Sequence, residues 1–139
     1  MNQIDSARRY LESARELTAV LDAGWTAFEV LVTACQHYQD GSPELFAAWA
    51  FAAAGAARGR TLIATAPSLG QDSPPAGPPD QDLPADEDQA ADDLAGLARL
   101  LHERLAAAAV RAGDSPDAVA CAEAGLQAAA VHRQLRREP

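Results

Sequence analysis

The first third of the chain carries a heptad repeat of apolar residues. Over residues 5–39 the apolar positions are spaced alternately by three and four residues, with one polar member: Leu11, Ala14, Thr18, Leu21, Trp25, Phe28, Val32 and Cys35. This spacing places all of them on one face of an α-helix. Gly24 interrupts the stretch, and a glycine in a helix interior costs about 1 kcal/mol relative to alanine. Because the repeat keeps its phase across Gly24, we expect one continuous helix over residues 5–39, with a break at Gly24 as the alternative.

The composition of the whole chain favours helices as well. Alanine, the best helix former, accounts for close to a quarter of the 139 residues, and aromatic residues make up only 5%. All 11 basic residues are arginine, and 20 acidic residues give a formal net charge of -9. We therefore expect an all-α fold, and we do not expect an all-β fold, a basic nucleic-acid binder or a disulfide-stapled mini-protein.

A sharp turn separates the first predicted helix from a second one over residues 43–66. Ser42 suits the N-cap, where its side chain accepts a backbone N–H bond, and Pro43 suits the first helical position. The first four turns of this helix are apolar nearly all round, so we expect it at the centre of the fold. Gly55 and Gly59 share one face, which predicts close packing against a neighbouring helix.

The character of the sequence changes over residues 67–91. Six of the nine prolines lie here, followed by a run of acidic residues, and no apolar periodicity is left. Residues 71–93 hold eight acids and no base, so the rest of the chain is close to neutral, with 12 acids against 11 bases. Low hydrophobicity, proline and like charge are typical of a flexible tether. A tether of this length leaves the direction of the third helix open.

A second helical hairpin is predicted over residues 92–137. Gly113 ends its first helix, and Ser115 and Pro116 begin its last one. The predicted inner faces consist of Leu94, Leu97, Leu101, Leu105 and Ala108 in the first helix, and of Val119, Ala122, Leu126 and Ala129 in the last. All seven aromatic residues precede residue 52, so this hairpin must pack on the first one to bury a sizeable core. The prediction is a single domain, a four-helix bundle built from two hairpins.

No motif for catalysis, cofactor binding or metal binding stands out. Zinc sites need cysteine or histidine at short spacings, and neither this pattern nor a glycine-rich phosphate loop occurs. We therefore expect no catalytic residues, no cofactor and no metal. Cys35 and Cys121 are expected to be buried and reduced, with a disulfide between the two hairpins as the alternative. The basic cluster at residues 132–137 suits the negative end of a helix dipole better than a nucleic acid.

Two hypotheses for function differ in kind, and the first is a non-catalytic interaction module. A continuous first helix of about 35 residues would be about 50 Å long and would overhang the shorter helices by about 15 Å. The overhang would expose an apolar stripe without a partner in its own bundle: Tyr10, Leu11, Ala14, Leu17 and Leu21. Such a stripe suits self-association or the docking of a partner helix, so we expect a protein partner or a homo-oligomer.

The alternative hypothesis is a bundle that binds a small apolar ligand. It rests on four large rings that face small residues and would line a pocket between helices: Trp25, Phe28, Trp49 and Phe51. An enzyme is the least supported class, because no polar group is placed to do chemistry. The charged N-terminal segment is unlike a secretory signal, and the longest apolar run, residues 45–57, is too short to cross a bilayer. We therefore expect a cytoplasmic protein with no nucleic-acid partner and no membrane partner.

Overall fold

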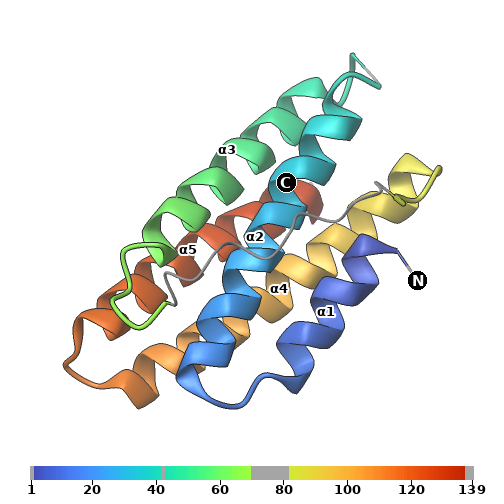
Figure 1. Ribbon diagram of the computed structural model, residues 1–139. Coiled ribbons are helices and arrows are strands. Elements are labelled where there is room, and N and C mark those ends of the chain that lie inside the picture. Colours follow the sequence, from blue (N-terminus) through green and yellow to red (C-terminus); the bar gives the residue numbers. More distant parts are fainter. Residues whose placement is uncertain (1, 42, 70–81, 137–139) are drawn as a thin grey trace.

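The computed structural model describes residues 2–41, 43–69 and 82–136, and within these ranges it is all-helical (Figure 1). The predicted all-α class is confirmed. The described residues form five helices, one more than predicted: α1 (Gln3–Ser13), α2 (Leu17–Gln39), α3 (Phe46–Ile63), α4 (Glu87–Ala112) and α5 (Pro116–Arg136).

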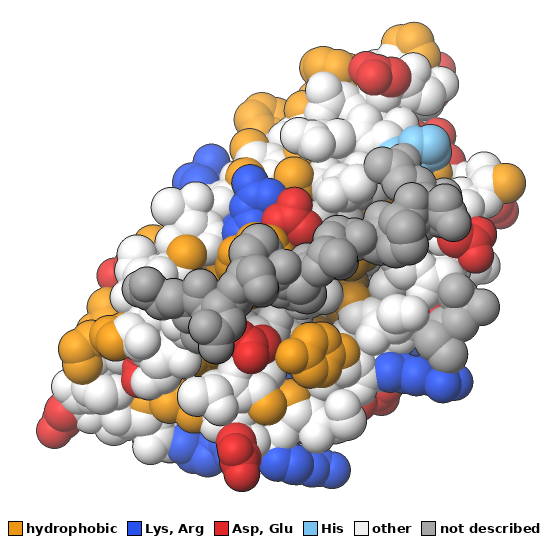
Figure 2. All heavy atoms as spheres, in the orientation of Figure 1, with side chains coloured by type: hydrophobic (Ala, Val, Ile, Leu, Met, Phe, Trp, Pro, Cys, Tyr) orange, Lys and Arg blue, Asp and Glu red, His pale blue; other side chains and the backbone are white. Residues whose placement is uncertain are grey.

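The helices pack around α2 and α4, which lie at the centre of the arrangement. Helix α2 contacts α1, α3 and α4, and α4 contacts α1, α2 and α5, while α3 packs chiefly against α2 and α5 (Figure 1). The prediction of a central second helix is therefore wrong. One side of α3 faces solvent and leaves Phe46 and Phe51 exposed. Hydrophobic side chains accordingly line part of the edge that α3 forms (Figure 2).

The first predicted helix is in fact two helices. The chain is extended at Ala14 (φ -72°, ψ 125°) and at Glu16 (φ -83°, ψ 155°), so α1 ends at Ser13 and folds back beside α2. Both predictions for this region, a continuous helix over residues 5–39 and a break at Gly24, are wrong. Gly24 lies inside α2, where a Cβ atom would come within 2.8 Å of the Cδ1 atom of Ile63.

Two arginines of α4 bind the backbone at this break. The guanidinium group of Arg104 donates to the carbonyl oxygen of Glu12 at 3.2 Å, and that of Arg111 donates to the carbonyl oxygen of Arg15 at 2.8 Å. The carbonyl group of Glu12 lies in the last turn of α1, where carbonyls lack intrahelical partners, and that of Arg15 lies in the connection that follows. Tertiary contacts supply partners for both. Contacts from α4, rather than a helix-breaking residue, therefore accompany the bend.

The boundaries of α3 and α4 differ from the predicted ones. Pro43 lies in a turn, and α3 begins at Phe46 without a side-chain cap; Ser42, the predicted N-cap, lies outside the described residues. The centre of the predicted tether, residues 70–81, also lies outside them. Helix α4 begins at Glu87 rather than at residue 92, because the side chain of Asp86 accepts the Asp88 N–H at 3.0 Å and caps it.

The C-terminal hairpin follows the prediction at its turn and in α4. Gly113 adopts φ +66°, a conformation that favours glycine, and α5 begins at Pro116 as expected. The predicted inner face of α4 is buried. The predicted inner face of α5 is wrong, since Val119 and Leu126 are exposed. The buried residues of α5 are Asp117, Ala120, Cys121, Ala124, Gly125, Ala128, Val131 and Leu135.

Helix α2 is long and apolar enough to cross a membrane by length and composition. It has 23 residues and contains an 18-residue window with a mean hydropathy of 1.3. Uninterrupted apolar runs alone do not reveal this helix, because polar residues are interspersed along it. Because 56% of the window is buried against the rest of the chain, a core helix accounts for the same pattern.

Candidate functional site

The residues predicted to form an overhanging apolar stripe are mostly buried within the chain. Leu11 and Leu21 have no exposed surface and Ala14 is 5% exposed, because α1 packs against α2 and α4. Leu17 is half-buried, and only Tyr10 is exposed. The premise that this stripe lacks a partner in its own fold is wrong, since it depended on a continuous first helix.

The four rings predicted to line an apolar pocket are not brought together. Phe28 and Trp49 are buried and Trp25 is half-buried, but Phe51 is 63% exposed on the outer side of α3. A Cβ atom on Gly59 would lie 2.2 Å from the Cε1 atom of Phe28, so this ring fills the space that the glycine leaves open. The expected pocket lined by all four rings is therefore wrong.

Both cysteines are free and buried, so the alternative of a disulfide is wrong. Burial raises the pKa of the Cys35 thiol from 9.0 to about 12. Burial, with a smaller contribution from the charge of Asp117, raises the pKa of Cys121 to about 11. Thiols with such pKa values are poor nucleophiles at neutral pH. Among the described residues, no three histidine, cysteine or acidic side chains lie together as metal ligands would.

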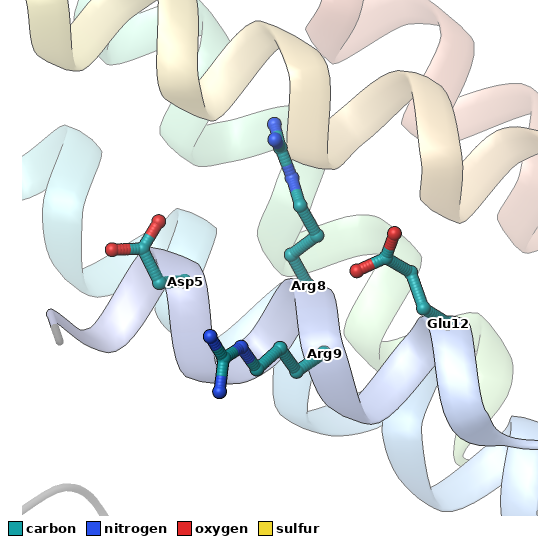
Figure 3. A pocket seen from close by; sticks show the side chains of 4 residues that line it. All are labelled: Asp5, Arg8, Arg9 and Glu12. Atoms are coloured by element: carbon teal, nitrogen blue, oxygen red, sulfur yellow. The ribbon is translucent and has the colours of Figure 1, made fainter.

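A shallow hollow of about 320 Å³ lies over α1, lined by Asp5, Arg8, Arg9 and Glu12 (Figure 3). Arg8 extends from α1 toward α4, where its Nη2 atom lies 2.5 Å from the place of a Cβ atom on Gly96 (Figure 3). Two acids and two bases give the hollow no net charge, so it selects neither an anion nor a cation. Its side chains serve best as the solvated rim of the contact between α1 and α4.

A polar and aromatic cluster fastens the start of α4 to the hairpin of α2 and α3. The rings of Tyr38 and Trp49 stack with their centroids 5.1 Å apart. The indole Nε1–H of Trp49 donates to Oε1 of Glu87 at 2.6 Å, and the hydroxyl of Tyr38 donates to the carbonyl oxygen of Pro84. Burial, and then the charges of Asp93 and Glu87, raise the pKa of Tyr38. All its donors have partners, so this cluster is structural.

A second polar contact holds the segment after α3 against the start of α5. Asp117 is buried, and its carboxylate accepts the backbone N–H of Ser68 at 3.0 Å and the hydroxyl of Ser68 at 2.6 Å. The same carboxylate lies in the first turn of α5, where the helix dipole favours negative charge. This arrangement satisfies the buried carboxylate without a ligand.

An apolar surface without a partner in the fold lies on the outside of α4 and α5. His102 and Gly125 set the register of this hairpin, since Nδ1 of His102 lies 3.0 Å from the carbonyl oxygen of Gly125. With α5 turned so that Gly125 faces α4, its larger side chains point outward. Val110, Val119 and Leu126 are 81%, 59% and 66% exposed. We call the exposed set formed by Ala106, Val110, Val119, Ala122 and Leu126 the outer face.

Charged side chains of both signs border the outer face. Arg99 and Glu103 of α4 form an exposed salt bridge at 3.2 Å, and Glu123 and Arg133 of α5 are exposed. Periodicity alone assigned Val119 and Leu126 to the core, because they are the largest apolar residues in that part of α5. Gly125 is the sequence signal that indicates the opposite orientation of α5, since a glycine within a helix often marks the close approach of a neighbouring helix.

No protein-family model, curated protein or solved structure matches this chain.

Proposed function

We propose that the chain is a non-catalytic protein–protein interaction module that self-associates through the outer face. The observation that carries the proposal is the exposure of Val110, Val119 and Leu126 together on one hairpin. The buried core is already extensive without them, so their apolar surface is left available for a partner. Contiguous exposed apolar side chains with a polar border are typical of interaction sites.

The outer face suits a second copy of the same chain. Its small residues, Ala106 and Ala122, allow another helix to approach closely, while the valine and leucine side chains supply apolar area. A two-fold pairing places the same surface on both sides of the interface. The border carries acids and bases in equal number, so each copy presents partners for the charges of the other. We propose the four helices α2 to α5 as the bundle that supports this surface.

The experiment that tests this proposal is sedimentation equilibrium of the full chain over a wide concentration range. We expect a dimer that Leu126→Glu and Val119→Glu each weaken by about tenfold or more, because each places a charge in an apolar interface. Phe51→Ser is the matched control, since it removes an equally exposed apolar side chain from α3. A monomer at all concentrations, or equal weakening by all three variants, would contradict the proposal.

The ligand-binding alternative is not favoured, because the structure separates Phe51 from the other three rings. The expectations of a cytoplasmic location, and of no nucleic-acid or membrane partner, stay predictions from composition and charge. Fractionation of native cells with an antibody against the chain would test the location.

A further inference from the structure

The connection between α1 and α2 lacks the residues that normally end helices. It consists of Ala14, Arg15 and Glu16, all of which are good helix formers, and it contains neither glycine nor proline. The heptad spacing also runs through it without a change of phase, from Leu11 to Leu21. Local sequence therefore favours a continuous helix at the point where the structure has a bend.

Tertiary contacts hold the bent form in place. Helix α2 begins at Leu17, and its N-cap residue, Glu16, makes no side-chain capping bond. The carbonyl groups of Glu12 and Arg15 accept from Arg104 and Arg111 instead of from helical N–H groups. In a continuous helix these carbonyls would bond to N–H groups four residues along the chain. Local and tertiary preferences therefore compete at these three residues, which is characteristic of a hinge.

We propose that residues 14–16 are a hinge through which two copies of the chain exchange α1. In the closed form, α1 lies on its own α2 and α4. In the open form, α1 and α2 make one continuous helix, and α1 occupies the same site on α2 and α4 of a second copy. The proposal goes beyond the proposed function, because it uses neither the outer face nor any residue in it.

After the exchange, α1 makes with α2 and α4 of the second copy the same contacts that it makes within its own chain in the closed form. The buried apolar side chains of α1 are Ile4, Ala7 and Leu11. In the closed form they pack against the rest of their own chain, and in the open form they would pack against the second copy. Helices α1 and α2 run side by side in opposite directions (Figure 1). Two extended helices, placed antiparallel, therefore reproduce this packing twice around a two-fold axis. Exchange of an identical element is a low-cost route to a dimer, because few new contacts are needed.

One substitution in the hinge and one in the α4 side chain that binds it shift the equilibrium between the closed and open forms in opposite directions. Arg15→Pro suits the bend, since the preceding residue, Ala14, already has the extended conformation that a following proline requires. It opposes a continuous helix, so we expect the exchanged dimer to fall by about a hundredfold. Arg111→Ala removes the bond to the Arg15 carbonyl in the closed form only, so we expect more dimer.

The test is to refold the full chain at high concentration and measure the dimer by analytical ultracentrifugation after dilution. Leu126→Glu is included in every protein, so that association through the outer face does not contribute. Arg15→Ala is the matched control and should keep the dimer, because alanine suits both forms. If the proline variant fails to fold, a variant with two glycines inserted after Arg15 replaces it. We expect the same loss of the exchanged dimer, because glycine also disfavours a continuous helix.

A direct readout distinguishes exchange from other association. Chains with a donor dye on Ser6→Cys are refolded with chains carrying an acceptor dye on Glu103→Cys, both exposed positions, on α1 and α4 respectively. We expect energy transfer between chains that Arg15→Pro abolishes and Arg111→Ala increases. No transfer, or equal transfer in all variants, overturns the exchange. Loss of the outer-face dimer upon Leu126→Glu bears on the proposed function alone, so the two proposals fail separately.

Discussion

At the residue scale, replacing glycine by alanine should have different effects at Gly59 and Gly96, because the added Cβ atom contacts different side chains. A Cβ atom on Gly59 would lie 2.2 Å from the ring of the fully buried Phe28. A Cβ atom on Gly96 would meet the end of the Arg8 side chain, which is flexible. We expect Gly59→Ala to destabilise the fold by about 1–3 kcal/mol, because a packed ring must move.

Gly96→Ala is the control for this prediction. Arg8 can turn aside, so the higher helix propensity of alanine should leave stability unchanged or raise it by up to about 1 kcal/mol. Urea unfolding of both variants measures the difference. Equal effects of the two substitutions would show that Phe28 is free to move.

The buried thiols predict a decline of stability in alkali. The unfolded chain releases a thiol proton at about pH 9, whereas folding raises the pKa of Cys35 from 9.0 to about 12. Ionisation therefore favours unfolding, so the contribution of Cys35 is fully present below about pH 9 and is lost as the pH rises toward 12. The chain has no lysine, so no ammonium group of a side chain titrates in this window.

Urea unfolding at pH 8 to 11.5 measures this decline. We expect a loss on the order of a few kcal/mol, and a shallower slope in a variant with Cys35→Ala and Cys121→Ala. The tyrosines account for the slope that is left, since the pKa of Tyr38 is also raised. An unchanged slope in the double variant would mean that the thiols ionise equally well in the folded chain.

At the element scale, one contact fixes where α4 begins relative to α3. The indole N–H of Trp49 donates to Glu87 in the first turn of α4. We expect Trp49→Phe to cost about 1–3 kcal/mol, from the lost bond to a charged acceptor and the smaller ring. Glu87→Gln keeps an acceptor oxygen and should cost less. Thermal unfolding compares the two, and a larger loss for Glu87→Gln would contradict this role for the bond.

The sequence predicts the helices correctly where helix propensity and capping residues alone determine their class and their ends. Alanine content predicted the all-α class, and Gly113 and Pro116 marked the last turn because their backbone preferences act locally. The bend after Ser13 was not predictable, since residues 14–16 favour a helix and the partners of the bent backbone come from α4. Tertiary contacts overrode the local preference there.

The outer face was missed for a related reason. Periodicity assigns large apolar side chains to the core, yet α5 turns Gly125 and three of its alanines (Ala120, Ala124 and Ala128) inward so that α3 and α4 can approach. Val119 and Leu126 are left outside as a consequence. In a chain this rich in alanine, the need for close packing between helices competes with the burial of the largest side chains. A hydrophobic pattern alone does not show whether close packing of the helices or burial of the largest side chains determines which face of a helix is buried.

At the scale of the whole molecule, α1 is the helix most easily separated from the rest. It has 11 residues and packs chiefly on α2 and α4, whereas α2 and α4 each contact three other helices. An isolated helix of this length is unstable in water, so α1 depends on its buried side chains, chiefly Ile4 and Leu11. The molecule should therefore open in parts, with α1 detaching before the other helices unfold.

Native-state hydrogen exchange tests this order of opening. We expect the amides of α1 to exchange at a lower free energy of opening than those of α2 and α4. Ile4→Ala should lower the protection of α1 by about tenfold or more, since it removes buried methyl groups from that helix, and should leave α4 protected. Equal loss of protection in all helices would mean that α1 opens only with the whole fold. Separate opening of α1 is the step that an exchange between two copies requires.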